Sequence, residues 1–333
     1  MRTPSSVLVA ALVTGLLAFG AAAQSVTFKV ASLAPKGSAW ANILTRGAAD
    51  IEKKTEGRVK VQFFFQGQGD EKDIVRKVKL GQLDGAALTG IGLGLINPDV
   101  RVLDIPFAFT SDKQLDYVRK AMAPDFERQF KEAGYILLGW GDVGWVHLYS
   151  NIEVNSKDAL KKTKMWTWTD DPIAKGLFSQ LGIEGVGMGV PDVLPSLSTG
   201  KIDACYGSPL AAVALQWYTK VKFATSQPIG YASGALIVSK KVFEKLAAAD
   251  QKAMIEGGHA VGEQLKGLVR KDNERAKAAM KKSGIAFTET PAAFVTELRN
   301  AATAARSALV GKDKSYSKTA LDTFLKHLAA APK

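Results

Sequence analysis

In the first part of the chain, stretches with the two-residue period of a strand alternate with stretches that have the period of a helix. Residues 26–30 and 59–65 carry apolar side chains in the alternating manner of strands, whereas 40–51 have the three-to-four-residue spacing of a helix. A second helix is predicted over 70–79 and a third strand over 83–88. Strands that alternate with helices predict an α/β fold with a parallel sheet covered on both faces. Ligands of such folds bind where loops leave the carboxyl ends of the strands.

The same alternation returns in the middle of the chain. Strands are predicted over 145–150, 164–169 and 202–206, and a helix over 171–181. Pro172 stands at the start of this helix, where its missing N–H is harmless. These elements predict a second α/β domain.

The last third of the chain predicts one more strand and a long helix. Residues 231–239 are apolar and strand-like, and a polar-faced helix extends from beyond Asp250 to about Lys282, ending at Ser283 and Gly284. A helix of this length can brace two domains.

The chain is long enough for two domains, because single hydrophobic cores stop growing at about 250–300 residues. We assign residues 24–145 and about 231–250 to domain I and residues 146–230 to domain II. The long bracing helix and the C-terminal helices, over 251–333, are expected to pack across both.

The first residues predict export. A positive charge at Arg2 is followed by an apolar run over 7–19 and by small residues at 21–23, which is the order of a secretory signal. A membrane anchor needs about 20 apolar residues, and this run is shorter and broken by glycine. We expect residues 1–23 to be removed, leaving a soluble periplasmic protein that is a monomer.

Composition excludes several classes of protein. With 47% hydrophobic and 23% charged residues, the chain is neither disordered nor membrane-embedded. The formal charge of +12 could indicate nucleic-acid binding, but the lysines are spread over amphipathic segments and export argues against that partner. The single cysteine, Cys205, cannot form an internal disulfide and is interpreted as a small buried residue.

No local motif indicates catalysis, a metal or a cofactor. The histidines, His147, His259 and His327, lie in unlike segments, and His147 is either a packed or surface residue or a ligand. The glycine-rich stretches 90–94 and 185–189 lack the spacing of a nucleotide-binding loop. An enzyme on this fold remains an alternative, without a visible catalytic group.

Several stretches carry a resemblance to a known family. They are residues 33–38 with Trp40, 77–85, 102–107, 139–141, 208–210 with 216–217, 231–235 and 238–241. Together they are specific, and the whole mature chain resembles the DctP-like solute-binding subunits of tripartite ATP-independent periplasmic (TRAP) transporters.

This resemblance implies a two-domain fold like that of periplasmic binding proteins, with the ligand cleft between the domains. Members of the family close around a small organic solute, usually a carboxylate, and deliver it to an ion-driven membrane permease. The resemblance therefore implies a receptor that is not an enzyme.

Three positions depart from the family pattern. Trp166 stands where typical members carry an arginine that binds the substrate carboxylate, Val146 replaces a second arginine, and Gly207 replaces an asparagine. Arg101 and Lys164 remain as nearby basic candidates. Because tryptophan offers a flat apolar face and one N–H donor, we predict an aromatic, apolar or weakly charged solute.

Loops from both domains are expected to supply the ligand contacts. The predicted ligand-binding residues are Trp40, Gln66, Thr89, Phe107, Trp145, Trp166, Trp168, Asp170, Gly207, Ser208, Pro209 and Trp217. Tryptophans on strands also serve as core residues, and Asp170 or Asp171 is suited to cap the helix that follows. A ligand-presenting partner of a sensor, or a carrier of apolar or lipidic molecules, is an alternative function for the same fold.

Overall fold

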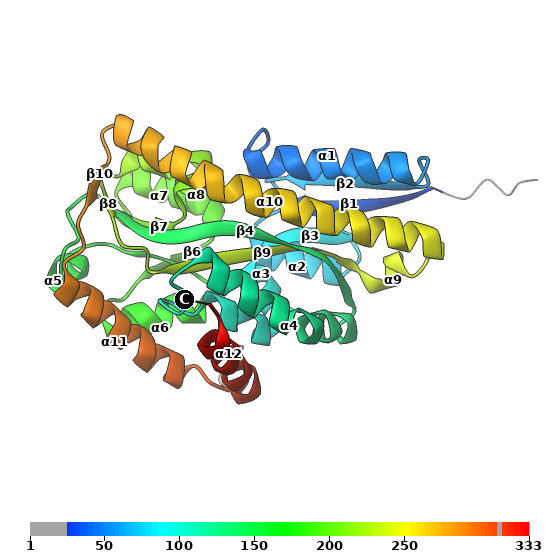
Figure 1. Ribbon diagram of the computed structural model, residues 1–333. Coiled ribbons are helices and arrows are strands. Elements are labelled where there is room, and N and C mark those ends of the chain that lie inside the picture. Colours follow the sequence, from blue (N-terminus) through cyan, green and yellow to red (C-terminus); the bar gives the residue numbers. More distant parts are fainter. Residues whose placement is uncertain (1–24, 312–314, 333) are drawn as a thin grey trace, which may run out of the picture.

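The computed structural model describes residues 25–311 and 315–332, and the predicted signal segment lies outside them (Figure 1). A twisted sheet runs along the molecule with helices on both of its faces (Figure 1). Within the described residues, no helix is both long and apolar enough to cross a membrane.

The first lobe is built from parallel strands joined by helices, as the sequence predicts. Strand β1 (Val26–Ser32) lies between β2 (Val59–Phe65) and β3 (Gly85–Thr89) and is parallel to both. Helices α1 (Ala39–Lys54) and α2 (Glu71–Lys79) form the two connections.

Two long strands carry the sheet from the first lobe into the second. Strand β4 (Tyr135–Ser150) pairs antiparallel with β9 (Gly230–Ser239), which also pairs with β3. From His147 onward, β4 pairs instead with β7 (Ala204–Gly207) and β8 (Phe223–Thr225). We call the part built on β2, β1, β3 and β9 the first lobe, and the part beyond His147 of β4 the second lobe.

The strand predicted over 145–150 is the end of β4, which begins at Tyr135. Shifts of register occur next to Gly139 and between Asp142 and Gly144. Such bulges break the alternation of side chains along a strand, and the glycines carry no side chain that would reveal it. The sequence pattern therefore showed only the regular end of this strand.

The second lobe combines short strands with short helices. Strands β5 (Trp166–Trp168) and β6 (Val186–Met188) are parallel. Helix α6 (Pro172–Gln180) follows β5, α7 (Val193–Thr199) precedes β7, and α8 (Pro209–Ala214) follows it. The predicted α/β class with flanking helices is confirmed.

The remaining elements complete both lobes. They are α3 (Gly90–Gly94), η1 (Pro98–Asp104), α4 (Asp112–Glu132), α5 (Lys157–Lys161), η2 (Val190–Asp192), η3 (Trp217–Lys220), α9 (Lys240–Phe243), β10 (Ala286–Thr288), α11 (Ala292–Ala308) and α12 (Lys318–Ala330).

The predicted bracing helix is α10 (Ala248–Lys282), which crosses the molecule from one end to the other (Figure 1). A Cβ atom added to Gly262 would lie 2.3 Å from the carbonyl oxygen of Trp140, so the helix backbone packs directly on β4. In the second lobe, the Asn273 side chain accepts a hydrogen bond from the N–H of Leu210. The helix thus holds both lobes.

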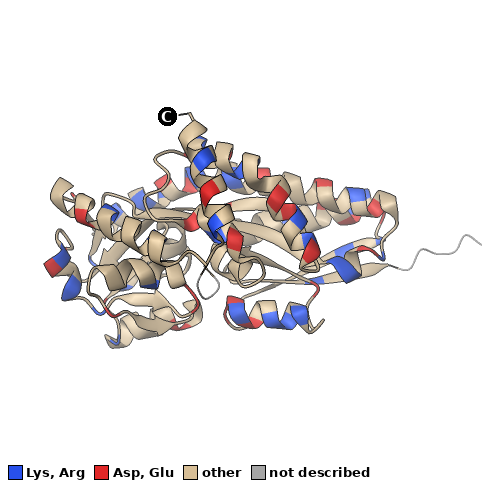
Figure 2. Ribbon diagram, turned by 90° about the horizontal axis from the view of Figure 1, so that it is seen from below, with Lys and Arg blue, Asp and Glu red and all other residues tan. Residues whose placement is uncertain are grey.

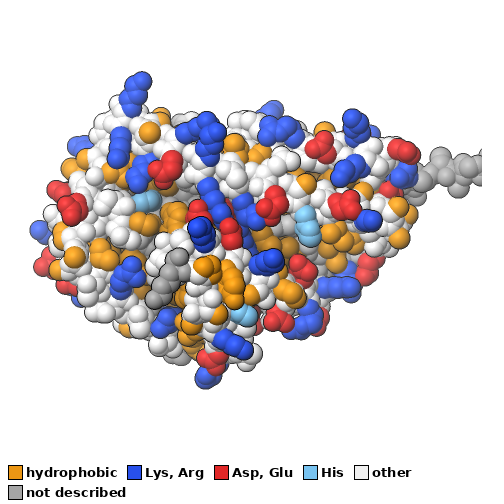
Figure 3. Space-filling view, viewed as in Figure 1, with side chains coloured by type: hydrophobic (Ala, Val, Ile, Leu, Met, Phe, Trp, Pro, Cys, Tyr) orange, Lys and Arg blue, Asp and Glu red, His pale blue; other side chains and the backbone are white. Residues whose placement is uncertain are grey.

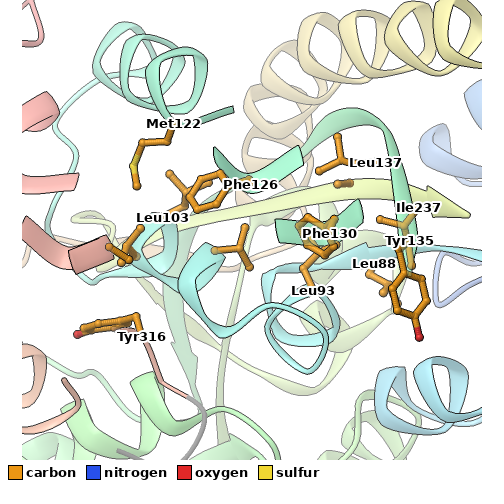
Figure 4. Close-up of a cluster of buried hydrophobic side chains, with 14 of the residues drawn as sticks. Leu88, Leu93, Leu103, Met122, Phe126, Phe130, Tyr135, Leu137, Ile237 and Tyr316 are labelled. Carbon is orange, nitrogen blue, oxygen red and sulfur yellow. The ribbon is translucent and has the colours of Figure 1, made fainter. Parts of the chain in front are cut away.

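Helix α4 covers the other face of the first lobe. Its Met122, Phe126 and Phe130 are buried in a cluster that includes Leu137 of β4 and Ile237 of β9 (Figure 4). In the second lobe, Cys205 of β7 is buried without a disulfide partner, which confirms its interpretation as a small core residue.

Basic and acidic residues are interspersed along the helices (Figure 2). On the face that carries α10, lysine and arginine side chains are scattered among acidic and apolar ones (Figure 3). Such a mixed distribution fits a solvated surface rather than a single basic binding face.

Candidate ligand-binding cavity

A cavity of about 200 Å³ lies between the two lobes. The first lobe contributes the loop after β1, Trp40 of α1 and the end of β3, and the second contributes β5, β7, α8 and Trp217. Parts of β4, β9 and α10 line it from the shared region. Most of the lining is apolar, and a cavity of ~150 Å³ with such walls already holds one aromatic ring.

The structure brings seven of the twelve predicted residues to this cavity. They are Trp40, Thr89, Trp166, Trp168, Gly207, Ser208 and Trp217. The other five do not line it: Gln66, Phe107, Trp145, Asp170 and Pro209.

Two of the aromatic residues outside the cavity have other neighbours. Phe107 packs against the guanidinium of Arg299, whose central carbon is 5.1 Å from the ring centroid. The indole N–H of Trp145 donates to Asp112 at 2.9 Å, and its ring meets Tyr231 edge-on.

The polar residues outside the cavity are also accounted for. Gln66 is exposed just after β2, and Asp170 pairs with Lys72 at 3.1 Å. Pro209 opens α8. Of the two candidate caps for α6, Asp171 accepts hydrogen bonds from the N–H groups of Ile173 and Ala174, whereas Asp170 does not cap this helix.

Four tryptophans contribute to the cavity wall. Trp166 is 1% exposed, and its ring stacks on Tyr206 with centroids 4.8 Å apart. The rings of Trp217 and Trp168 lie 5.3 and 6.0 Å from it. Aromatic pairs at these separations each contribute roughly 0.5–1.5 kcal/mol beyond the burial of their area. Trp166 is therefore both a core residue and part of the cavity wall.

Three of these tryptophans use their indole N–H groups within the protein. Trp166 donates to the carbonyl of Met188 at 3.0 Å, and Trp40 donates to the carbonyl of Asp142 at 3.1 Å. Trp168 donates to a carboxylate oxygen of Asp70 at 2.6 Å. These side chains consequently offer ring surface to a ligand rather than hydrogen-bond donors.

Glu71, at the start of α2, is a cavity residue that the sequence pattern did not identify. Its carboxylate accepts hydrogen bonds from the N–H and hydroxyl of Thr89 and from the N–H of Gly92. Desolvation by burial raises its pKa to about 7. In the sequence it is indistinguishable from an exposed first-turn acid, which is common in helices.

The two basic candidates named from the sequence do not supply a cation to this cavity. Arg101 is 3% exposed, and its guanidinium lies 2.6 Å from Asp171 and 3.1 Å from Asp104. Lys164 is exposed, and its ammonium donates to the carbonyl of Gly200. Among the described residues, the wall of this cavity therefore contains no basic side chain in place of the arginine that the resemblance implies at position 166.

His147 is a packed residue. Its Nδ1 lies 2.8 Å from the carbonyl oxygen of Thr225, and burial lowers the pKa of its imidazole to about 4. The side chain is therefore neutral at physiological pH. Across residues 25–311 and 315–332, no group of three or more His, Cys, Asp or Glu residues is placed to hold a metal ion.

Three polar contacts join the lobes beside the cavity. They are the pairs Trp168–Asp70, Lys72–Asp170 and Arg101–Asp171, each linking the region of α2 or η1 to the segment around β5 and α6. Because these segments lie on opposite sides of the cavity, the contacts hold the lobes in a closed arrangement.

Trp168→Phe should weaken this closed arrangement. The substitution removes the donor to Asp70, a partly buried carboxylate whose pKa is raised by burial, and hydrogen bonds to charged groups contribute roughly 1.5–3 kcal/mol. We expect a lower free energy of unfolding in urea and a larger radius of gyration in solution scattering. Trp145→Phe is the matched control, because it removes an indole bond to Asp112 within one lobe and should leave the radius unchanged. An equal radius for both variants would contradict the prediction.

Comparison with known proteins agrees with the fold. The family model described as "Bacterial extracellular solute-binding protein, family 7" matches residues 30–311. A solute-binding protein of Verminephrobacter eiseniae is 27% identical over 257 residues, covering 75% of this chain and 76% of that protein.

A second relative and a solved structure extend the comparison. The C4-dicarboxylate-binding periplasmic protein DctP of Rhodobacter capsulatus is 27% identical over 249 residues, covering 72% of this chain and 74% of that protein. The sugar-acid-binding protein of Advenella mimigardefordensis, solved with galactonate, superimposes with a TM-score of 0.86 over 93% of this chain and 99% of its own, at 17% identity. That identity shows a shared fold.

Proposed function

This chain belongs to the bacterial extracellular solute-binding proteins of family 7, and we propose that it is the periplasmic receptor of a TRAP-type transporter. It is a binding protein rather than an enzyme. In this role it captures a small organic solute between its lobes and presents the closed complex to a permease in the membrane.

The observation that carries the proposal is the cavity shared by the two lobes. Loops and strand ends of both lobes form its wall, and polar contacts such as Trp168–Asp70 close the lobes beside it. A solute that touches both lobes favours the closed state by the difference between its affinities for the closed and open states. Hinge closure is therefore the expected response to binding.

The hinge is expected where the lobes share backbone. Strand β4 exchanges its partner β9 for β7 at Val146 and His147, next to the bulge between Asp142 and Gly144. Two shared strands and α10 can bend over several residues without breaking the pairing in either lobe. This arrangement supports the division into two domains.

We assign ligand contact to the predicted residues that line the cavity. Those residues are Trp40, Thr89, Trp166, Trp168, Gly207, Ser208 and Trp217. The rings of the four tryptophans among them, one of which stands where the resemblance implies an arginine, favour a solute with an aromatic or aliphatic body. The R. capsulatus relative is described as C4-dicarboxylate-binding and the A. mimigardefordensis protein as sugar-acid-binding, so the type of solute differs among these similar proteins.

An apolar carrier or a partner of a sensor would use the same cavity, but membership of the solute-binding family favours transport. Delivery to a permease requires release when the lobes open. The polar contacts between the lobes beside the cavity are compatible with such reversible closure.

The test is native mass spectrometry of the protein purified without refolding. We expect one small molecule to remain bound per chain and to leave as an unchanged mass when the protein is denatured. A change in that mass on incubation would indicate turnover and contradict a pure receptor. Finding no bound compound, and no compound from a periplasmic extract that raises Tm, would count against the proposal.

A further inference from the structure

We propose that the solute is an organic cation, with an ammonium group beside Glu71 and an apolar or aromatic body against the tryptophan rings. The inference rests on the receptor function proposed above and names the chemical class of ligand for the same cavity. It follows from three features of the wall: a buried carboxylate that pairs with no cation among the described residues, the aromatic rings, and a described lining that contains acidic residues but no basic ones.

Glu71 is a buried carboxylate at the cavity wall. The residue is 1% exposed and accepts only neutral donors, two from Thr89 and one from the N–H of Gly92. Fully buried acidic residues are rare unless they are paired, and an uncompensated buried charge is unfavourable. A cationic group in the cavity would supply the missing partner.

The second carboxylate of the wall shows the contrast. Asp142 lies 2.7 Å from the guanidinium of Arg119 and 3.0 Å from that of Arg270, so its charge is compensated within the protein. Of the two acidic residues that line the cavity, Glu71 is therefore the one whose carboxylate can pair with a cationic group of the ligand.

The aromatic wall favours the same class. Trp40, Trp166 and Trp168 donate their indole N–H groups to protein acceptors, so these residues contribute ring surface rather than hydrogen-bond donors to the cavity wall. The negative face of an aromatic ring attracts a cation, as in the aromatic cages that recognise quaternary ammonium groups. The same quadrupole repels an anion.

The charges at the wall oppose an anionic ligand. Throughout the described chain, the residues that line this cavity include Glu71 and Asp142 but no lysine, arginine or histidine. A carboxylate ligand would meet a second carboxylate without a counter-ion, whereas an ammonium group would be attracted to it.

The pH dependence of binding offers an independent readout. Asp70, the N-cap residue that precedes Glu71, carries a negative charge that raises the pKa of Glu71 further, and Lys72 and Asp73 follow it on the same helix. Strand β3 and helix α3 contribute the neutral donors of Thr89 and Gly92. With a pKa of about 7 in the free protein, Glu71 is protonated as the pH falls, and a proton then competes with the cation.

The experiment compares three probes of matched size by calorimetry with the whole protein at pH 8. These are 2-phenylethylammonium, 2-phenylethanol and phenylacetate. We expect the ammonium to bind at least tenfold more tightly than the alcohol, and the acetate to bind least. Between pH 8 and pH 6 the affinity for the ammonium should fall about tenfold, while that for the alcohol should stay constant.

Glu71→Gln should abolish the preference for the ammonium over the alcohol, whereas Glu52→Gln, which removes an exposed carboxylate of the same lobe, should leave it intact. Should Glu71→Gln fail to fold, the probe series and its pH profile on the unaltered protein decide. No detectable binding of the ammonium, or equal or tighter binding of phenylacetate, overturns the inference. The receptor function is judged separately by the co-purified compound in native mass spectrometry.

Discussion

Replacing Arg101 with methionine should destabilise the protein by about 3–5 kcal/mol at neutral pH, because it leaves buried carboxylates without their cation. Arg101 lies 2.6 Å from Asp171 and 3.1 Å from Asp104 in a site that is almost closed to water. Methionine retains much of the apolar volume, so the lost charge dominates the effect. The free energy of unfolding in urea measures it.

The effect of Arg101→Met should depend on pH. Burial raises the pKa of Asp104 to about 6 in the intact protein, and Arg101 opposes that rise. A carboxyl whose folded pKa exceeds its unfolded value of about 3.9 gains stability as the pH falls. Without Arg101 the folded pKa rises further, so the difference between variant and unaltered protein should shrink from pH 7 to pH 5.

Two further variants separate this explanation from a general loss of charge. Adding Asp104→Asn to Arg101→Met should recover part of the lost stability, because it removes one of the orphaned charges. Arg128→Met removes an exposed guanidinium that pairs with Glu132 on the same helix and should have no measurable effect. Equal losses for Arg101→Met and Arg128→Met would show that burial of the pair is not the cause.

Trp166→Ala should cost about 3–5 kcal/mol of stability and should abolish retention of the solute. Replacing a buried tryptophan by alanine removes its apolar contacts and leaves a void. Here the lost contacts include the stack on Tyr206 and the edge contact with Trp217. The bound compound seen in native mass spectrometry and the urea unfolding curve report the two effects.

Trp145→Ala is the matched control for Trp166→Ala. Trp145 is also a large aromatic residue with a bonded indole N–H, but it does not line the cavity. Its loss should lower stability while the bound compound stays. A compound retained by Trp166→Ala but lost from Trp145→Ala would contradict the assignment of the binding wall.

Much of this protein can be derived from local sequence pattern. The periods of apolar residues predict the strands and helices of the first lobe, because these elements bury one face each. Asp171 and Pro172 mark the start of α6, since capping and proline preferences act over a few residues. Tryptophan at position 166, where the resemblance to the family implies an arginine, is the residue from which we predict a changed ligand.

The positions of side chains relative to the cavity depend on tertiary structure. Trp145 and Trp168 look alike in sequence, yet the bulge between Asp142 and Gly144 disrupts the side-chain alternation just before Trp145. Because successive residues of a strand face opposite sides, an extra residue reverses the expected facing of those beyond it. The pattern of apolar residues along the strands therefore could not show which of these two tryptophans lines the cavity.

The electrostatics of the cavity were likewise decided by packing. In the sequence, Glu71 reads as an ordinary acid in a first turn and Arg101 as a free basic candidate. Packing of α2 against Thr89 and Gly92 removes Glu71 from water. Packing of η1 near Asp171 places Arg101 in an ion pair, so its charge is neutralised within the protein. The sequence by itself therefore determined the helices and strands and which residue stands at position 166. Contacts between segments distant in the sequence determined which charged groups a ligand meets in the cavity.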